Sequence, residues 1–258
     1  MQRTARGRGR REGGLIDGPE SVTAIATAEL CDRIIDGRLA MGAHVTEHAL
    51  AAEIGVGRQS LREALRALES RRAIVHVPRA GSRVVQLTLQ DAFQVTTVRE
   101  QLEALAVQQG VPANGETFER LRTAMDAMER NARSGDETRA PHDGLQFHTA
   151  LVNLAGNDHL NAAYAAIALP VAILMRLNRQ AQAGAESLLE RAARHRRVVD
   201  LIAEGHPDAV LAELRAHHTA AYLLGDHLSA HDASDDALAW AGSLGRVDRG
   251  ASPDASAP

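Results

Sequence analysis

The chain has 258 residues, a formal net charge of −4 at pH 7 and 45% hydrophobic residues, but Phe, Trp and Tyr together make up only 2%. This length exceeds that of an ordinary single domain and accommodates one small and one larger domain. A core with so few aromatic residues has to be built from Ala, Leu, Val and Ile, which favours closely packed helices.

The same inventory excludes several classes of protein. Cys31 is the single cysteine, which excludes an internal disulfide, and no apolar signal-peptide segment follows the N-terminal arginines. The longest apolar run, residues 162–175, has 14 residues, short of the roughly 18 to 20 that a membrane-spanning helix needs. We therefore expect a cytoplasmic protein in which this run forms a buried helix.

Positive charge is concentrated in one stretch. Between Arg58 and Arg83 there are seven arginines and two glutamates, a net charge of +5, so the rest of the chain carries −9. A basic segment on an acidic protein indicates a local contact with a polyanion such as nucleic acid. Charge alone leaves open that the stretch is simply a solvated helix surface.

Composition and apolar spacing divide the chain into four parts. Residues 1–18 are rich in Gly and Arg and predict a disordered arm. Residues 19–88 and 89–230 carry the regular patterns of two folded domains. Residues 231–258 alternate Ala, Ser, Asp and Gly, which predicts a disordered tail, although Leu238 and Trp240 could dock on the folded part.

The first domain is predicted to be a winged helix-turn-helix. Helices are expected over 22–35, ended by Asp36 and Gly37, over 47–54, ended by Gly55, and over 58–70. The buried side of the first helix is formed by Ile25, Leu30, Ile34 and Ile35. Two short helices separated by a Gly-containing turn describe a helix-turn-helix. The β-rich runs 73–77 and 82–87, joined by residues 78–81, predict the hairpin that forms the wing.

From residue 88 onward the pattern is helical, which predicts an all-α antiparallel bundle and a mainly α fold overall. Gly-containing and Pro-containing breaks separate its helices. The expected ranges are 89–109, 115–133, 143–155, 157–181, 185–204 and 208–228.

The stretch VGRQSLREALRAL, residues 56–68, has the pattern of a DNA recognition helix. Its apolar residues share one side, while polar residues project from the other side near the helix start. These are Arg58, Gln59, Arg62 and Arg66. The beginning of a recognition helix meets the base edges in the major groove, and Arg makes two hydrogen bonds to guanine.

The residues LAAEIGVGRQSLREALRALESRRAIVHVPRAGSRVV resemble the winged helix of the GntR family of bacterial transcription regulators. The resemblance implies that Arg58 and Arg62 contact bases or nearby phosphates and that Gln59 and Ser60 contact phosphate. It also implies that Gly81 lets the wing approach the minor groove. Arg66, His48 and Arg79 complete the expected DNA-binding set. Salt bridges to nearby glutamates remain the alternative role of these arginines.

The sequence departs from that family pattern at four places. Gly57 stands where serine is usual, Gln59 and Ser60 replace a Thr-Pro pair, His48 stands where arginine is common, and Ala80 stands where the wing usually has arginine. Fewer contacts to the DNA backbone are expected as a result.

Three histidines of the helical part are spaced as candidate metal ligands. His195 and His217 each lie eleven residues from His206, which marks the turn of a predicted helical hairpin. Residues equidistant from such a turn lie at the same height, so both imidazoles can face one point in the bundle core. His148 could supply a third ligand. The alternative is three histidines hydrogen-bonded within a polar core.

The segments DGLQFHTALVNLAGNDHL and ERAARHRRVVDLIAEGHPDAVLAELRAHH resemble the ligand-binding FCD domain of one GntR branch. That resemblance implies a divalent metal held by three His and one Asp, the Asp four residues before the first His. Gly144 occupies that position, and Asp143 lies about 140° away from His148 on a regular helix. Asp143 is a possible fourth ligand only if the helix begins irregularly. Three imidazoles favour Zn or Ni over Mn.

The resemblance also implies an arginine that binds an acidic effector, at Arg99. A guanidinium pairs well with a carboxylate, and an intrahelical pair with Glu103 is the alternative. Asn157 could donate to the same ligand or cap a helix, and Arg176 is a further candidate.

Together these patterns predict a homodimeric DNA-binding repressor, not an enzyme, that binds a palindromic operator and responds to a small organic acid. Two alternatives remain open. One is a metal sensor without an organic effector, and the other is a metal-dependent hydrolase built on His148, His195 and His217.

Overall fold

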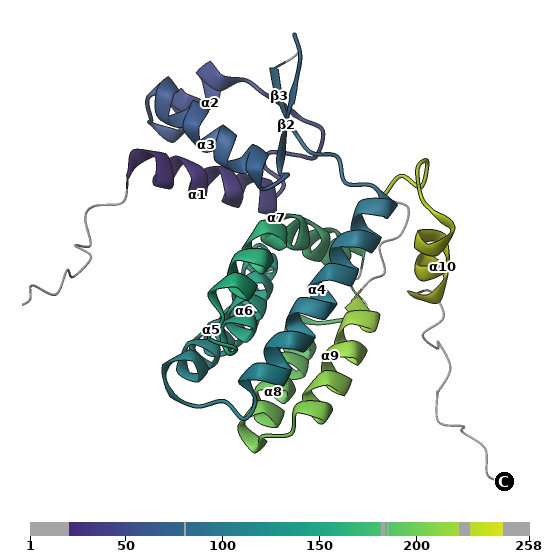
Figure 1. The fold of residues 1–258 in the computed structure, drawn as a ribbon. Coiled ribbons are helices and arrows are strands. Elements are labelled where there is room, and N and C mark those ends of the chain that lie inside the picture. Colours follow the sequence, from purple (N-terminus) through teal and green to yellow (C-terminus); the bar gives the residue numbers. More distant parts are fainter. Residues whose placement is uncertain (1–20, 80, 182–183, 185, 222–227, 245–258) are drawn as a thin grey trace, which may run out of the picture.

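The computed structural model describes residues 21–79, 81–181, 184 and 186–221, and 228–244; of residues 217–221 it describes the backbone alone. A small domain of three helices and a sheet lies at one end of a larger helical bundle (Figure 1). The predicted winged helix followed by an all-α bundle is thereby confirmed. The predicted arm, residues 1–18, lies outside the described residues.

The helices of the small domain have the predicted bounds: α1 (Val22–Ile35), α2 (Glu47–Ile54) and α3 (Arg58–Ser70). The Ser21 hydroxyl accepts a hydrogen bond from the Ala24 amide at the start of α1, and Gly55 ends α2 in the left-handed conformation. Ile25 was predicted to be buried, but it is 47% exposed. Ala26, one position further along α1, lies in the core instead.

The wing is a three-stranded antiparallel sheet in the order β1-β3-β2. The predicted hairpin is formed by β2 (Ile74–Val77) and β3 (Gly81–Val84), with His76 opposite Ser82. The third strand, β1 (His44–Val45), was not predicted; it pairs with β3. Two residues carry too little alternation to mark a strand.

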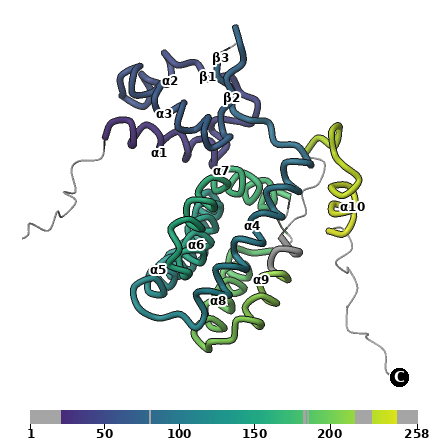
Figure 2. Tube along the Cα trace, viewed as in Figure 1, coloured from purple at the N-terminus to yellow at the C-terminus, as the bar shows by residue number. Residues whose placement is uncertain are grey.

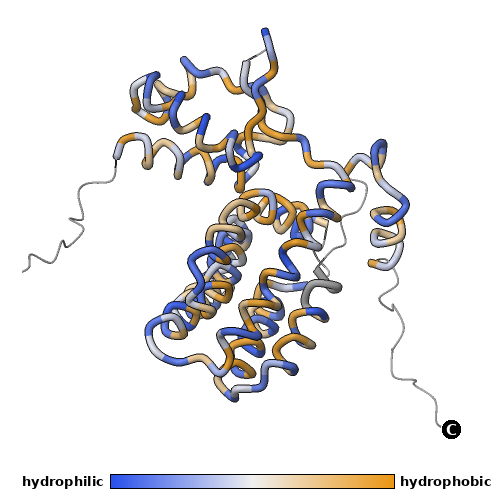
Figure 3. Tube along the Cα trace, in the orientation of Figure 1, coloured by the Kyte–Doolittle hydropathy of each residue, from blue (hydrophilic) through white to orange (hydrophobic). Residues whose placement is uncertain are grey.

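The bundle contains six helices in the described residues. Their bounds are α4 (Leu89–Gly110), α5 (Gly115–Ser134), α6 (Ala140–Asn153), α7 (Asp158–Ala181), α8 (Leu188–Glu204) and α9 (Pro207–Ala221). Helix α6 begins three residues before the predicted start, because Pro141 fits in the first turn of a helix, where no amide hydrogen bond is lost. Hydrophobic and hydrophilic positions alternate along these helices (Figure 3), as expected for one buried side each.

Helix α7 is both long and apolar. By length and composition it could cross a membrane, yet more than half of its apolar window is buried inside the protein. The apolar run 162–175 lies within this helix, which is longer than the run because residues 158–161 and 176–181 extend it at both ends. Helix α7 packs against α4 and α6, in accord with the predicted buried helix.

The two domains share one hydrophobic cluster. Leu30, Ile34 and Leu68 of the winged helix belong to the same cluster as Ile173 and Leu177 of α7. Helix α1 contacts α7 directly. The apolar junction therefore holds the winged-helix domain against one particular bundle helix.

The predicted disordered tail is wrong for residues 235–244, which form α10 (Asp235–Leu244). This helix lies beside the beginning of α4 (Figures 1 and 2). The ring of Trp240 lies 5.8 Å from that of Phe93, and Leu244 is buried. Docking of these side chains supplies the stability that the Ala-rich and Ser-rich composition does not indicate. Residues 245–258 lie outside the described part of the chain.

Candidate functional site

Helix α3 carries exposed arginines on the side opposite a fully buried side. Leu61, Ala64 and Leu68 are 0% exposed, whereas Arg58, Arg62 and Arg66 are all exposed. Gln59 is also exposed and Ser60 is half-buried. The hydrophobic core thus fixes the rotation of α3 so that its basic side faces away from the protein.

The ion pairing of these arginines is uneven. The Nε of Arg62 donates to a carboxylate oxygen of Glu47 at 2.7 Å, and Gln59 donates to Glu63 at 3.0 Å. Among the described carboxylates, none pairs with Arg58. The salt-bridge alternative is therefore present at Arg62 and not at Arg58. Exposed pairs of this kind are worth little, so a DNA phosphate can replace Glu47.

The wing extends the same surface. Gly81 has a φ of +78°, and a Cβ there would lie 3.1 Å from Nε2 of His44, so the turn requires glycine. Arg79 on the wing and His48 on α2 are exposed. An open groove of about 360 Å³ separates α3 from the wing and is bordered by Arg62, Arg66, His76 and Ser82. Arg62 and Arg66 of α3 therefore border the same groove as His76 and Ser82 of the wing.

A second group of polar side chains lies inside the bundle. The imidazoles of His148 on α6 and His195 on α8 are each 1% exposed, with ring centroids 5.6 Å apart. Nδ1 of His195 contacts the Arg191 carbonyl oxygen at 2.8 Å, and Nδ1 of His148 lies 3.1 Å from Oε1 of Glu103. The carbonyl acceptor at Nδ1 of His195 favours the tautomer of that ring with the proton there and the lone pair on Nε2.

His195 is held in the neutral form that a metal ligand needs. Burial and the neighbouring His148 lower the pKa of His195 well below its ordinary value, which keeps it neutral. A histidine that binds a metal through one ring nitrogen typically donates a hydrogen bond from the other ring nitrogen, as Nδ1 of His195 does. No three His, Cys, Asp or Glu side chains converge as a metal group within the described residues. His217 belongs to α9, but its side chain lies outside the description. The donors present fit a nitrogen-preferring ion such as Zn or Ni.

The structure contradicts the possible role of Asp143 as a fourth ligand. Helix α6 is regular at this point, and the Asp143 amide donates to the Arg139 carbonyl at 2.9 Å. The Asp143 carboxylate instead accepts hydrogen bonds from Nδ2 of Asn131 on α5 at 2.9 and 3.0 Å. Burial raises the pKa of Asp143. At the expected aspartate position, a Cβ on Gly144 would meet Met175 and Arg191.

The three predicted effector residues lie apart from one another. Arg99 is buried in α4, and its Nε donates to Glu103 at 2.7 Å, the pairing considered as the alternative role. Asn157 accepts hydrogen bonds from the backbone amides of residues 159 and 160 and so caps α7. Arg176, near the other end of α7, borders a cleft against the winged helix.

Glu103 occupies a central position among these polar side chains that was not predicted from the sequence. Its carboxylate accepts from Arg99, accepts from the Tyr164 hydroxyl at 3.3 Å and contacts His148. The spacing of Arg99 and Glu103 indicated their pairing within α4. The contacts with α6 and α7 depend on tertiary packing, for which the sequence gives no local signal.

Comparison with known proteins gives the same division of the chain. The family described as "Bacterial regulatory proteins, gntR family" matches residues 24–84, and the FCD domain matches residues 94–220. The chain is 31% identical over 191 residues to the probable D-xylose utilization operon transcriptional repressor of Paenarthrobacter nicotinovorans. The aligned region covers 74% of this chain and 82% of that relative.

Two further relatives agree. The gluconate operon transcriptional repressor of Bacillus licheniformis is 29% identical over 133 residues, 51% of this chain and 54% of that protein. A crystal structure of a GntR transcriptional regulator from Rhodococcus sp. RHA1 has the same fold, with a TM-score of 0.66 at 24% identity over 76% of this chain and 92% of that one. With its winged helix, its helical bundle and these relatives, the chain belongs to the GntR family of DNA-binding transcription regulators, in the branch that carries an FCD domain.

Proposed function

We propose that the protein is a homodimeric repressor that binds a palindromic operator and releases it when a small organic acid binds. One observation carries the DNA-binding part of this proposal. Arg58, Arg62 and Arg66 project from one side of α3, and the opposite side is held in the hydrophobic core. This arrangement suits insertion into the major groove, where arginine reads guanine.

Repression is supported by the relatives. Two of them are named as transcriptional repressors, one of a D-xylose utilization operon and one of a gluconate operon. A protein of this kind acts in the cytoplasm, where bacterial DNA lies. Sugars and sugar acids are therefore the first effectors to test.

A dimer is supported by an apolar strip on the outside of α4. Val98 is 45% exposed and Leu105 is 39% exposed, two turns apart on the same helix. A second copy packed here would bury both residues. Two α3 helices about 34 Å apart can then contact successive major grooves of one operator.

A metal in the bundle core is a separate part of the proposal. His148 and His195 would hold it with His217, and these imidazole donors suit Zn or Ni. Metal content of the purified protein measures this directly. About one equivalent per chain supports the site, and metal-free protein that takes up neither ion excludes it.

The DNA-binding proposal is tested with the Arg58→Ala variant. Duplexes enriched by the full-length protein from a random library would be compared with shuffled sequences, with affinity measured by fluorescence anisotropy. We expect binding to the enriched site to weaken by about 1 to 3 kcal/mol, and binding to shuffled DNA to change little.

Arg130→Ala is the matched control, because Arg130 is an exposed arginine on α5. It should leave both affinities unchanged. Equal losses on both duplexes in Arg58→Ala would identify a phosphate contact, and no enrichment of any sequence by the wild-type protein would overturn specific operator binding.

A further inference from the structure

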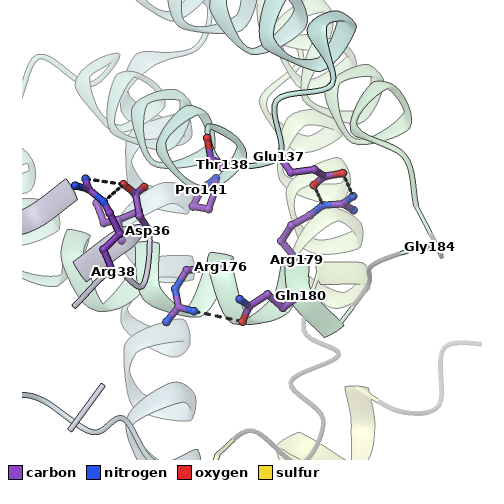
Figure 4. A pocket seen from close by; sticks show the side chains of 10 residues that line it. Asp36, Arg38, Glu137, Thr138, Pro141, Arg176, Arg179, Gln180 and Gly184 are labelled. Carbon is purple, nitrogen blue, oxygen red and sulfur yellow. Dashed lines mark hydrogen bonds and ion pairs between the residues drawn. The ribbon is translucent and has the colours of Figure 1, made fainter. Parts of the chain in front are cut away.

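An open cleft of about 700 Å³ lies where the winged helix meets the bundle. Three segments far apart in the sequence form it: the end of α1 with the following turn, the junction of α5 and α6, and the last turns of α7. Figure 4 shows Asp36 and Arg38 on one side of the opening and Glu137 and Arg179 on the opposite side. The volume is in the range of small-molecule sites.

Two of the three arginines that line the cleft already have carboxylate partners. Arg38 donates to Asp36 at 2.8 Å, and Arg179 forms two hydrogen bonds with Glu137, both at 2.6 Å. Each of these carboxylates is therefore neutralised locally. The charge of the third arginine, Arg176, remains in excess among the residues that line the cleft.

Arg176 has no carboxylate within ion-pair distance among the described residues. Its Nη1 reaches only the amide oxygen of Gln180, at 3.3 Å, and its Nε is buried without a hydrogen-bond partner. Burial lowers the pKa of Arg176, an effect that the charge of Asp36 opposes. A half-buried guanidinium with unused donors favours an anion that forms two hydrogen bonds, such as a carboxylate.

The rest of the lining indicates what such an anion carries. Ile35 and Pro141 offer an apolar surface, while the carboxylates of Asp36 and Glu137 and the amide of Gln180 offer partners for hydroxyl groups. The single excess positive charge suits a monoanion. We propose that this cleft binds a small hydroxylated monocarboxylate, with its carboxylate on Arg176.

The position of the cleft connects such binding to DNA affinity. The turn after α1 lies directly on Arg176, since a Cβ on Gly37 would lie 3.2 Å from its Nη1. Beside it, Nε2 of His142 on α6 contacts Asp36 at 2.6 Å. A ligand between these elements changes the contact between the winged helix and α7, and thus the spacing of the two α3 helices in a dimer. This inference rests on the proposed repressor function and gives its effector a site.

The test begins with the full-length protein and four hydroxylated monocarboxylates: gluconate, xylonate, glycerate and lactate. Glucose and xylose serve as uncharged counterparts. We expect at least one acid to raise the melting temperature and neither sugar to do so. Affinity for that acid, measured by calorimetry, should fall about 10- to 100-fold in Arg176→Gln, the effect of losing a charge-assisted hydrogen bond.

Arg130→Gln should bind the acid like the wild type. Arg176→Gln removes a half-buried charge, and circular dichroism checks that this variant folds. If it does not fold, Arg176→Lys is used in its place. The same loss of affinity is expected for Arg176→Lys, because lysine cannot form the bidentate pair. No stabilising acid, or an affinity unchanged in the Arg176 variant, overturns the cleft as the site.

Operator binding is measured in parallel without any acid. Specific DNA binding with no acid bound to the cleft is consistent with the proposed repressor function and overturns this inference. Acid binding that depends on Arg176, without sequence-specific DNA binding, supports the site and overturns the proposed function.

Discussion

The Arg99–Glu103 pair differs from the exposed i, i+4 ion pairs of the protein because it is buried. Its side chains are 4% and 1% exposed, compared with 62% and 80% for Arg120 and Glu116 on α5. Removing two charges from water is costly, and only close pairing with further hydrogen bonds compensates for it. The Tyr164 hydroxyl supplies one such bond to Glu103. The pair therefore links α4 to α7 as well as pairing within α4.

We predict that Glu103→Gln lowers the free energy of unfolding by about 3 kcal/mol, because it removes the carboxylate that neutralises buried Arg99. Glu116→Gln is the matched control at the same spacing on an exposed surface, where no measurable loss is expected. Urea unfolding of both variants measures the difference. Equal effects would show that burial adds nothing to the importance of this pair.

The carboxylate of Asp143 provides a prediction about pH. Burial raises its pKa, so folding disfavours the charged form. Above the raised pKa the group is ionised in both the folded and the unfolded state, and this cost is fully present. The cost disappears as the pH falls through the raised pKa, because the folded protein then takes up the proton first.

Asp143→Asn should accordingly be more stable than the wild type at pH 7, and this advantage should shrink as the pH is lowered toward 4. Chemical unfolding at several pH values measures the trend. Stability that is lower in the variant at pH 7 would mean that the hydrogen bonds from Asn131 outweigh the burial of the charge.

At the level of elements, close approach of backbones determines where the bundle helices cross. A Cβ on Gly110, at the end of α4, would lie 2.6 Å from the backbone carbon of Leu154, just after α6. Backbone atoms cannot move aside as the end of a flexible side chain can. Glycine is therefore required for α4 to reach α6 at this point.

Gly110→Ala should lower the free energy of unfolding by about 1 to 3 kcal/mol through overpacking. Gly242→Ala in α10 is the control, because its Cβ would meet nothing within 4 Å, and alanine favours helix. Thermal unfolding distinguishes the two. A Gly110 variant as stable as the wild type would show that the helices separate without cost.

The elements that sequence predicted well are those with their own local signals. Helices α1, α2 and α3 have the expected bounds because apolar periodicity, Gly55 and the Asp36-Gly37 turn all mark them in the sequence. β1 and α10 were missed, because β1 exists through pairing with β3 and α10 through the packing of Trp240 on Phe93. Long-range contacts of this kind leave no local pattern.

The candidate sites follow the same division. The basic side of α3 could be predicted, because one helix contains both its buried and its exposed residues. The cleft at Arg176 could not, since the residues around it come from α1, α6 and α7 and meet only in the folded chain. Arg176 was named from sequence, but its partners were not.

At the scale of the whole molecule, the proposed dimer predicts a change in assembly. Val98→Asp and Leu105→Asp place charges on the exposed apolar strip of α4 and should convert a dimer to monomers. Leu189→Asp on α8 is the control, because Leu189 is 54% exposed on another helix. Light scattering reports the mass, and dimers that persist in both α4 variants would place the interface elsewhere.

The end of the described chain returns to the junction between the domains. Leu89 donates its amide to the Ser229 carbonyl, Ser234 donates to Gln90, and Leu244 joins the hydrophobic cluster that contains the winged-helix core. A fragment that stops at residue 88 would contain the three helices and the wing. It would lack residues 229–244, which pack at the start of α4 beside the winged-helix core. The stability of the winged-helix domain therefore depends in part on residues 229–244, which follow it far along the chain.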